Sequence, residues 1–172
     1  MIDFNHDVYF LPISAQNIEA MRIARNTPEV RRWCRQVGLI SEIDQHEWFN
    51  DQNDDPTIRM FEVHNQGGEF VGVAGLTSID WINKRAEFSL YILPSYQLRG
   101  LACKALKTLF SHGFKDLNLN LIWGETFDKN PAAKVFKKIG MVKEGTRRDF
   151  YFKGGEYISA HLYSIRGSEW TF

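Results

Sequence analysis

Cysteine is scarce in this chain of 172 residues, and its two cysteines, Cys34 and Cys103, lie far apart. Two thiols without C-x-x-C spacing argue against a disulfide framework and against a zinc site. Metal-ligand spacing is also missing from the five histidines, which are His6, His46, His64, His112 and His161. We therefore expect no metal site and a reducing, cytoplasmic setting.

Net charge is absent as well, because 21 lysines and arginines balance 21 aspartates and glutamates. A neutral chain has no broad electrostatic attraction for nucleic acid or for anionic lipid. No apolar run approaches the roughly 18 residues that a membrane-spanning helix needs. The first residues also lack the basic and apolar segments of a signal peptide. We expect neither a nucleic-acid partner nor a membrane partner.

Hydrophobic and aromatic residues, in contrast, are plentiful, at 44% and 14% of the chain. This content and length predict a single domain over residues 1–172 with a sizeable core. The pattern is mixed α+β. Alternating or continuous apolar runs predict strands over residues 8–13, 58–64, 70–79, 85–93, 119–127, 141–152 and 157–165. Apolar spacing predicts helices over residues 15–25 and 103–115. Pro28 at a first turn predicts a helix over residues 29–35, and Gly140 as a stop predicts a short helix over residues 131–139.

Another helix is expected after Ser41, which forms a capping box with Asp44. A polar break is expected over residues 50–56. The two strand–helix units in the second half of the chain predict that strands 85–93 and 119–127 lie side by side and parallel.

The glycine turn between strand 85–93 and helix 103–115 has the sequence Gln97-Leu98-Arg99-Gly100-Leu101-Ala102. The first turn of a helix leaves N–H groups without partners and carries partial positive charge. Gly100 and Ala102 would let a phosphate approach this backbone closely, and Arg99 would add a full positive charge. The turn alone fits either an anion site or an ordinary loop.

Nearly the whole chain resembles the GNAT superfamily of acetyl-coenzyme A-dependent N-acetyltransferases. The resemblance rests on the element order, on Gln97-x-x-Gly100-x-Ala102, on segment 86–92 with its acidic Glu87, and on segments 130–141 and 144–157. The last segment resembles the branch of ribosomal-protein N-terminal, spermidine and nucleotide-aminosugar acetyltransferases. The resemblance implies a mostly antiparallel sheet of about seven strands, with one parallel pair that splays apart, flanked by helices.

Acetyl-coenzyme A is the co-substrate that the resemblance implies. Asn130 would hydrogen-bond its pantetheine arm, and Phe136 would pack beside the acyl-thioester end. Lys134 and Lys137 would contact adenosine-side phosphates or form a solvated helix face. The backbone that would pair with the pantetheine amides belongs to Leu90, Tyr91 and Ile92. The turn that would bind the pyrophosphate comprises Gln97, Leu98, Arg99, Gly100, Leu101 and Ala102.

Acetyl transfer needs a neutral amine, so a base is useful. Glu87 matches the acidic position that faces the acceptor in relatives, although a surface carboxylate paired with Arg85 or Lys84 is an alternative. Many relatives use a tyrosine as general acid where this chain has Phe136. Candidates for that role are therefore Ser89, Tyr91, Tyr96 and Tyr151. Cys103, near a helix start, would suit an acetyl-cysteine, or it is a small helix residue.

The acceptor site is expected to involve Arg31, Trp33, Trp81, Arg148 and Tyr151. Arginines suit a nucleotide-linked aminosugar or an acidic protein, whereas the acidic residues of segment 42–55 suit a polyamine or a basic protein terminus. We expect direct transfer of acetyl to a primary amine in a ternary complex, by a monomer or homodimer. The alternatives are a nucleotide-aminosugar N-acetyltransferase and a non-catalytic acyl-coenzyme A-binding module. Loss of turnover in Glu87→Gln would identify an enzyme.

Overall fold

One seven-stranded sheet organises the chain, in the order β1-β2-β3-β4-β5-β7-β6. The computed structural model describes residues 1–4 and 7–172, so His6 lies outside the described residues. The strands are β1 (Val8–Pro12), β2 (Arg59–Asn65), β3 (Phe70–Asp80), β4 (Arg85–Ile92), β5 (Leu121–Phe127), β6 (Val142–Lys153) and β7 (Glu156–Arg166). The α-helices are α1 (Ile18–Asn26), α2 (Pro28–Arg31), α3 (Glu42–Asp54), α4 (Leu101–Ser111) and α5 (Ala132–Lys138).

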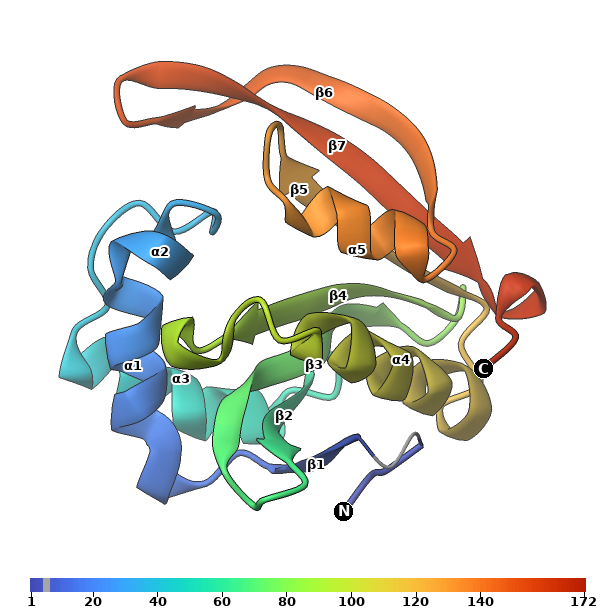
Figure 1. Cartoon of the computed structure of the whole chain (residues 1–172), viewed down its shortest axis with the longest axis horizontal. Coiled ribbons are helices and arrows are strands. Elements are labelled where there is room, and N and C mark those ends of the chain that lie inside the picture. Colours follow the sequence, from blue (N-terminus) through green and yellow to red (C-terminus); the bar gives the residue numbers. More distant parts are fainter. Residues whose placement is uncertain (5–6) are drawn as a thin grey trace.

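Neighbouring strands are antiparallel except β4 and β5, which are parallel. Their register holds for only three pairs, Arg85 with Leu121, Ala86 with Ile122 and Glu87 with Trp123. Figure 1 shows β1 to β4 with α4 in the lower part of the view, and β5 to β7 with α5 in the upper part. The predicted fold class, including the splayed parallel pair, is confirmed.

The two faces of β4 pack against different helices, because successive side chains of a strand point to opposite sides. Phe88 meets Phe110 of α4 with ring centroids 5.4 Å apart and belongs to the main core. Tyr91 packs on a second cluster built from Ile13, Met21 and Val73, which Trp48 and Phe49 of α3 also join. The odd-numbered residues Glu87 and Ser89 therefore share the face of Tyr91.

Some predicted boundaries are wrong. The helix predicted over residues 103–115 begins at Leu101, because Gly100 is its N-cap, and after Ser111 it continues as one π turn, His112–Asp116. The third helix runs through the expected polar break to Asp54, where Gln52 is buried while Asn50, Asp51, Asn53 and Asp54 face solvent. The second helix ends at Arg31 rather than residue 35, and the chain continues as turns.

Strand β5 begins at Leu121 rather than residue 119, because the Asn120 and Leu121 amides both bond to the Lys84 carbonyl. None of the helices in the described part of the chain has the length and apolar character that crossing a bilayer requires. Within residues 1–4 and 7–172, no group of three or more His, Cys, Asp or Glu side chains is placed to hold a metal ion.

Candidate active site

The gap between β4 and β5 opens where a phenylalanine meets a glycine. A Cβ built on Gly124 of β5 would lie 2.4 Å from Cε1 of Phe88, so the Phe88 ring lies directly against the Gly124 backbone. Phe110 and Phe136 hold this ring edge-on from the core side. The ring thus fills the core beneath the point where β4 and β5 separate. Beyond it, residues 88–92 of β4 pair with β3 but not with β5.

The turn before α4 presents an open helix N-terminus at the end of β4. Leu98 and Gly100 both have left-handed backbones, with φ of 63° and 76°. Among the described residues no side chain caps this helix, and nothing lies within 4 Å of a Cβ built on Gly100. The first-turn N–H groups therefore have no side-chain cap, and the space beside Gly100 is open, as an anion site requires.

Two predicted residues brace this turn. The Gln97 carboxamide donates to the Ile92 carbonyl at 3.0 Å, which ties the turn to the end of β4. The Arg99 guanidinium donates to the Ser95 carbonyl at 2.9 Å and stacks on the Tyr96 ring. Arg99 remains exposed beside the helix start, so its charge is available to an anion.

Asn130 and Phe136 lie on the other side of the gap, at α5. The Asn130 carboxamide oxygen accepts from the Ala132 amide at 2.9 Å, which orients its nitrogen end outward from this bond. Phe136 is buried between Phe88 and Tyr163, with centroid distances of 5.1 and 5.5 Å. The Phe136 ring is therefore part of the core and packs against Phe88 at the point where β4 and β5 separate.

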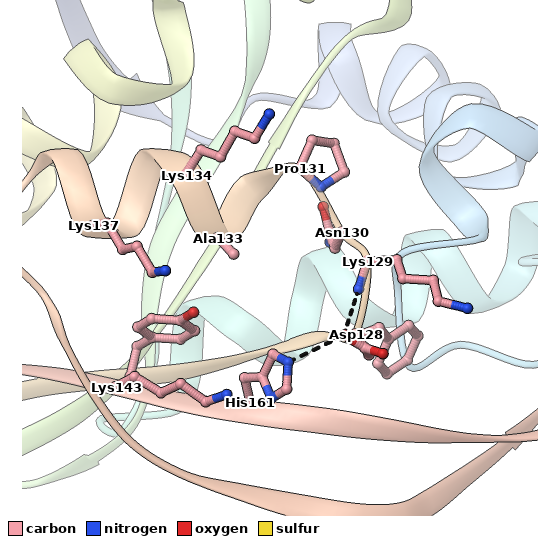
Figure 2. Close-up of a pocket in the computed structure, with 11 residues that line it drawn as sticks. Asp128, Lys129, Asn130, Pro131, Ala133, Lys134, Lys137, Lys143 and His161 are labelled. Atoms are coloured by element: carbon pink, nitrogen blue, oxygen red, sulfur yellow. Dashed lines mark hydrogen bonds and ion pairs between the residues drawn. The ribbon is translucent and has the colours of Figure 1, made fainter.

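A groove of about 370 Å³ adjoins Asn130 between α5 and the β6–β7 hairpin. Figure 2 shows Lys137, Lys143 and His161 around it, with His161 bonded to Asp128. Lys129 and Lys134 complete a lysine-rich lining. The groove borders the end of β5 at Phe127, and none of its lining residues belongs to β4.

Glu87 is a buried carboxylate at the last paired position of β4. Its partner is Arg35, whose Nη2 lies 2.7 Å from Glu87 Oε1. The alternative pairing with Arg85 or Lys84 is wrong, because Arg85 pairs with Asp80 at the strand start. Glu87 therefore faces the side of the sheet that carries α1 to α3.

Glu125 of β5 is a second buried carboxylate in the same cluster. Arg35 Nη1 lies 3.6 Å from Glu125 Oε1, so one guanidinium joins both carboxylates. Glu125 Oε2 also accepts from Arg147 at 3.0 Å, and Oε1 accepts from the Tyr151 hydroxyl. Burial lowers the pKa of Arg35, but Glu87, Tyr151 and Glu125 outweigh it and the net direction is upward.

Tyr151 reaches this cluster because β6 is irregular there. The register of β6 against β7 shifts between Arg147 and Tyr151, and Asp149 has a φ of 49°. Burial and the bond to Glu125 raise the pKa of the Tyr151 hydroxyl. Tyr151 thus donates to the Glu125 carboxylate and belongs to the same cluster as Glu87 and Arg35.

Tyr91 has a different environment from Tyr151. Its ring packs on the Ile13–Met21–Val73 cluster with the Arg25 guanidinium 5.8 Å from its centroid. Burial raises the pKa of its hydroxyl well above the usual value of 10.0. Ser89 lies one position before Leu90 on the same partly exposed stretch of β4. The roles predicted for Ser89 and Tyr91 stay predictions.

The remaining acceptor-site candidates are only partly brought together. Lys153 of β6 donates to the carbonyls of Arg31, Cys34 and Gln36, which joins the Arg31 region to the hairpin. Trp33 is partly exposed in the same turn, and Arg148 is exposed on β6 near its bulge. Trp81 lies apart in the β3–β4 turn, where its indole donates to the Pro56 carbonyl at 3.0 Å.

Sequence reasoning missed Arg35, Glu125 and Lys153. A signal existed for Glu125, since a single carboxylate in the apolar strand Leu121–Phe127 must be buried and therefore needs a partner. Arg35 and Lys153 carry no comparable local signal, because their partners lie far away in the sequence.

Comparison with known proteins points to one family. A family model described as "Acetyltransferase (GNAT) domain" matches residues 7–142. A spermidine N(1)-acetyltransferase of Escherichia coli strain K12 is 28% identical over 156 residues, which is 90% of this chain and 83% of the relative. An L-amino acid N-acetyltransferase of the same strain is 28% identical over 153 residues, 85% of this chain and 90% of the relative.

Solved structures share the fold. The spermidine N-acetyltransferase from Vibrio cholerae, solved in complex with CoA and spermine, superposes with a TM-score of 0.91. It is 23% identical, and the match covers 96% of this chain and 98% of that one. A dodecameric structure of the Vibrio cholerae enzyme in an intermediate state has a TM-score of 0.83 at 23% identity, with coverage of 95% and 96%.

Proposed function

This chain belongs to the GNAT family of acetyltransferases, and from that premise we propose direct acetyl transfer to a primary amine in a ternary complex, with Glu87 as base. The family uses acetyl-coenzyme A as donor, and the chain is accordingly an acetyl-coenzyme A-dependent N-acetyltransferase. The observation that carries the proposal is the position of Glu87. It is buried at the last paired position of two strands that separate directly after it.

The residues at the gap fit the donor. Unpaired N–H groups at the start of α4, beside exposed Arg99, suit a pyrophosphate. The free edge of β4 at Leu90, Tyr91 and Ile92 suits the amides of pantetheine, as an additional strand would. The Ile92 carbonyl already accepts from Gln97, so we assign the pantetheine contacts mainly to the backbone before it. Acetyl-coenzyme A supplies an acyl carbon activated as a thioester.

Glu87 would receive the proton that the acceptor nitrogen loses, directly or through one water. The nitrogen forms its new bond to the acyl carbon, the carbon–sulfur bond breaks, and the thiolate departs and takes a proton from solvent. A thiol with a pKa near that of cysteine, about 8.5, leaves without a strong acid, which is consistent with phenylalanine at position 136. Backbone N–H groups of segment 90–92 would face the developing oxyanion.

Two measurements on the purified chain test this function. Coenzyme A at about a hundred times its dissociation constant should add about 2.7 kcal/mol to the unfolding free energy and raise the melting temperature. Release of free thiol from acetyl-coenzyme A should then depend on an added amine, screened over polyamines, amino acids, peptides and nucleotide-linked aminosugars. Stabilisation without amine-dependent thiol release would instead favour an acyl-coenzyme A-binding module. The absence of stabilisation would contradict the donor site.

Quaternary structure is a separate proposal. We retain a monomer or homodimer, as predicted from the sequence, although one Vibrio cholerae structure of this fold is dodecameric. Light scattering coupled to size-exclusion chromatography measures the mass directly. A mass of one or two chains of 20.0 kDa supports the proposal, and a larger assembly contradicts it.

A further inference from the structure

We propose that Glu87 and Glu125 form an ammonium-binding site for the acceptor, and that the guanidinium of Arg35 occupies this site until the acceptor displaces it. The proposal deepens the function above and rests on it in one respect, namely that the acceptor enters from the Glu87 side. It assigns Arg35 a role as an internal competitor, which limits the apparent affinity for cationic amines.

Two buried carboxylates in one cluster require positive charge. The side chains of Glu87 and Glu125 are only 9% and 4% exposed, whereas that of Arg35 is 53% exposed. A buried carboxylate without a cation or hydrogen-bond donor is costly. Arg35 meets this need from the solvent side, so it is the member of the cluster that an incoming ligand can replace.

The two carboxylates do not depend on Arg35 equally. Glu125 also binds Arg147 and Tyr151, and these contacts remain when Arg35 leaves. For Glu87, the ion pair recorded in the described part of the chain is the one with Arg35. An incoming ammonium group must therefore satisfy Glu87 above all, which brings the acceptor nitrogen to the proposed base.

Charge selects the class of ligand. With Arg35 in place, two carboxylates face two guanidinium groups, and without it the cluster carries one excess negative charge. An alkylammonium restores neutrality, whereas an anionic acceptor does not. The cluster thus favours amines that carry positive charge and no nearby carboxylate or phosphate.

Arg35 sits on a segment that can move without breaking a helix. Residues 32–41 form turns and bends between α2 and α3. Lys153 holds this segment through three carbonyls, two of them from Cys34 and Gln36, which flank Arg35. Lys153 is therefore a positioning residue for Arg35, and displacement of the guanidinium needs only rotation of its long side chain or a local shift of this segment.

The test measures amine binding without turnover. Isothermal titration of 1,4-diaminobutane, butylamine and 5-aminopentanoate would be compared in the native chain, Arg35→Met and Arg85→Met. Arg85 is the matched control, because it forms an exposed ion pair with Asp80 outside the cluster. If Arg35 fills the site nine-tenths of the time, its removal tightens diamine binding about tenfold. Arg85→Met should leave the diamine affinity unchanged. Of the three ligands, 5-aminopentanoate should show the smallest increase in affinity in Arg35→Met.

A second pair of variants keeps the result unambiguous. The affinity of Arg35→Lys for the diamine should lie between those of the native chain and Arg35→Met, because lysine retains a competing positive charge on a shorter side chain. The double variant Arg35→Met/Glu87→Gln should not show the increase in diamine affinity that Arg35→Met shows over the native chain. Unchanged or weaker diamine binding in a folded Arg35→Met chain overturns the proposal. The titration measures amine binding and the thiol assay measures acetyl transfer. Failure of this proposal and failure of the proposed function are therefore observed in separate experiments.

Discussion

Glu87 on β4 lies in register with Trp123 on β5, and the two parallel strands separate directly after this pair. The carboxylate consequently stands where the sheet stops being continuous. On one side of β4 the Phe88 ring fills the core, and on the other Arg35 covers Glu87. The separation of the strands and the position of the proposed base thus have a common structural origin.

Gly124→Ala tests the packing that accompanies this separation. The added Cβ would lie 2.4 Å from the Phe88 ring, which Phe110 and Phe136 hold in place. We expect a loss of about 1–3 kcal/mol in the free energy of unfolding, as in other overpacked cores. Urea unfolding measures it. Gly145→Ala, where a Cβ would meet nothing within 4 Å, is the control, and equal losses in both variants would refute the packing argument.

Gly100→Ala tests the helix-start turn as the donor site. A side chain in the left-handed region costs about 1–2 kcal/mol, so the turn should shift and the KM for acetyl-coenzyme A should rise severalfold. Gly154→Ala is the control, because Gly154 is also left-handed, with φ of 63°, but lies in the β6–β7 turn. Steady-state kinetics at saturating amine measure the KM for acetyl-coenzyme A in both variants. A similar rise in KM for both variants would mean that backbone strain alone is responsible.

Tyr91→Phe tests the burial of the Tyr91 hydroxyl through alkaline unfolding. Burial raises the pKa of this group, so the folded chain keeps a proton that the unfolded chain loses near pH 10. Stability should therefore fall as the pH rises above 10, by at most about 1.4 kcal/mol per pH unit for one proton.

We expect a shallower fall in Tyr91→Phe than in the native chain, measured by urea unfolding from about pH 9 to pH 11. Tyr157→Phe, which changes an exposed ring on β7, is the control. The same slope in Tyr91→Phe and the native chain would show that the hydroxyl titrates as it does in the unfolded state.

Lys153→Met tests how segment 32–41 is held. The Lys153 ammonium donates to carbonyls of Arg31, Cys34 and Gln36, and methionine cannot. We expect faster amide hydrogen exchange in residues 32–41, with little change in β3 and β4. Lys138→Met, on the exposed face of α5, should leave exchange in this segment unchanged. Unaltered exchange in Lys153→Met would show that other contacts hold the segment.

The sequence predicts the local parts of this structure well, because they have local causes. An apolar run predicts β4, and Gly100 in segment 97–102 predicts the turn before α4. Glu87 is predicted as the acidic residue of β4 through the family resemblance. The signals for β4 and for the turn lie within about ten residues of the feature, whereas the prediction of Glu87 also depends on the resemblance of distant segments to the family.

Pairings between distant residues have no such signal. Arg35 and Glu87 are 52 residues apart, and Tyr151 and Glu125 are 26 apart. The contact from Tyr151 also depends on an irregularity in β6 that alternation does not reveal. The sequence predicts a helix over residues 29–35, but α2 ends at Arg31 and Arg35 lies in the turns that follow. The contacts that the sequence does not predict are therefore those of the Arg35, Glu87, Glu125 and Tyr151 cluster.

Glu87→Gln is the measurement that tests the central claim most directly. The substitution keeps the shape and removes the base, so kcat for acetyl transfer should fall by about 10²- to 10⁴-fold, while coenzyme A affinity, measured by titration calorimetry, stays within about twofold. Glu69→Gln, on the exposed β2–β3 turn, should retain native kcat. Native kcat in a folded Glu87→Gln chain would contradict the assignment of Glu87 as the base.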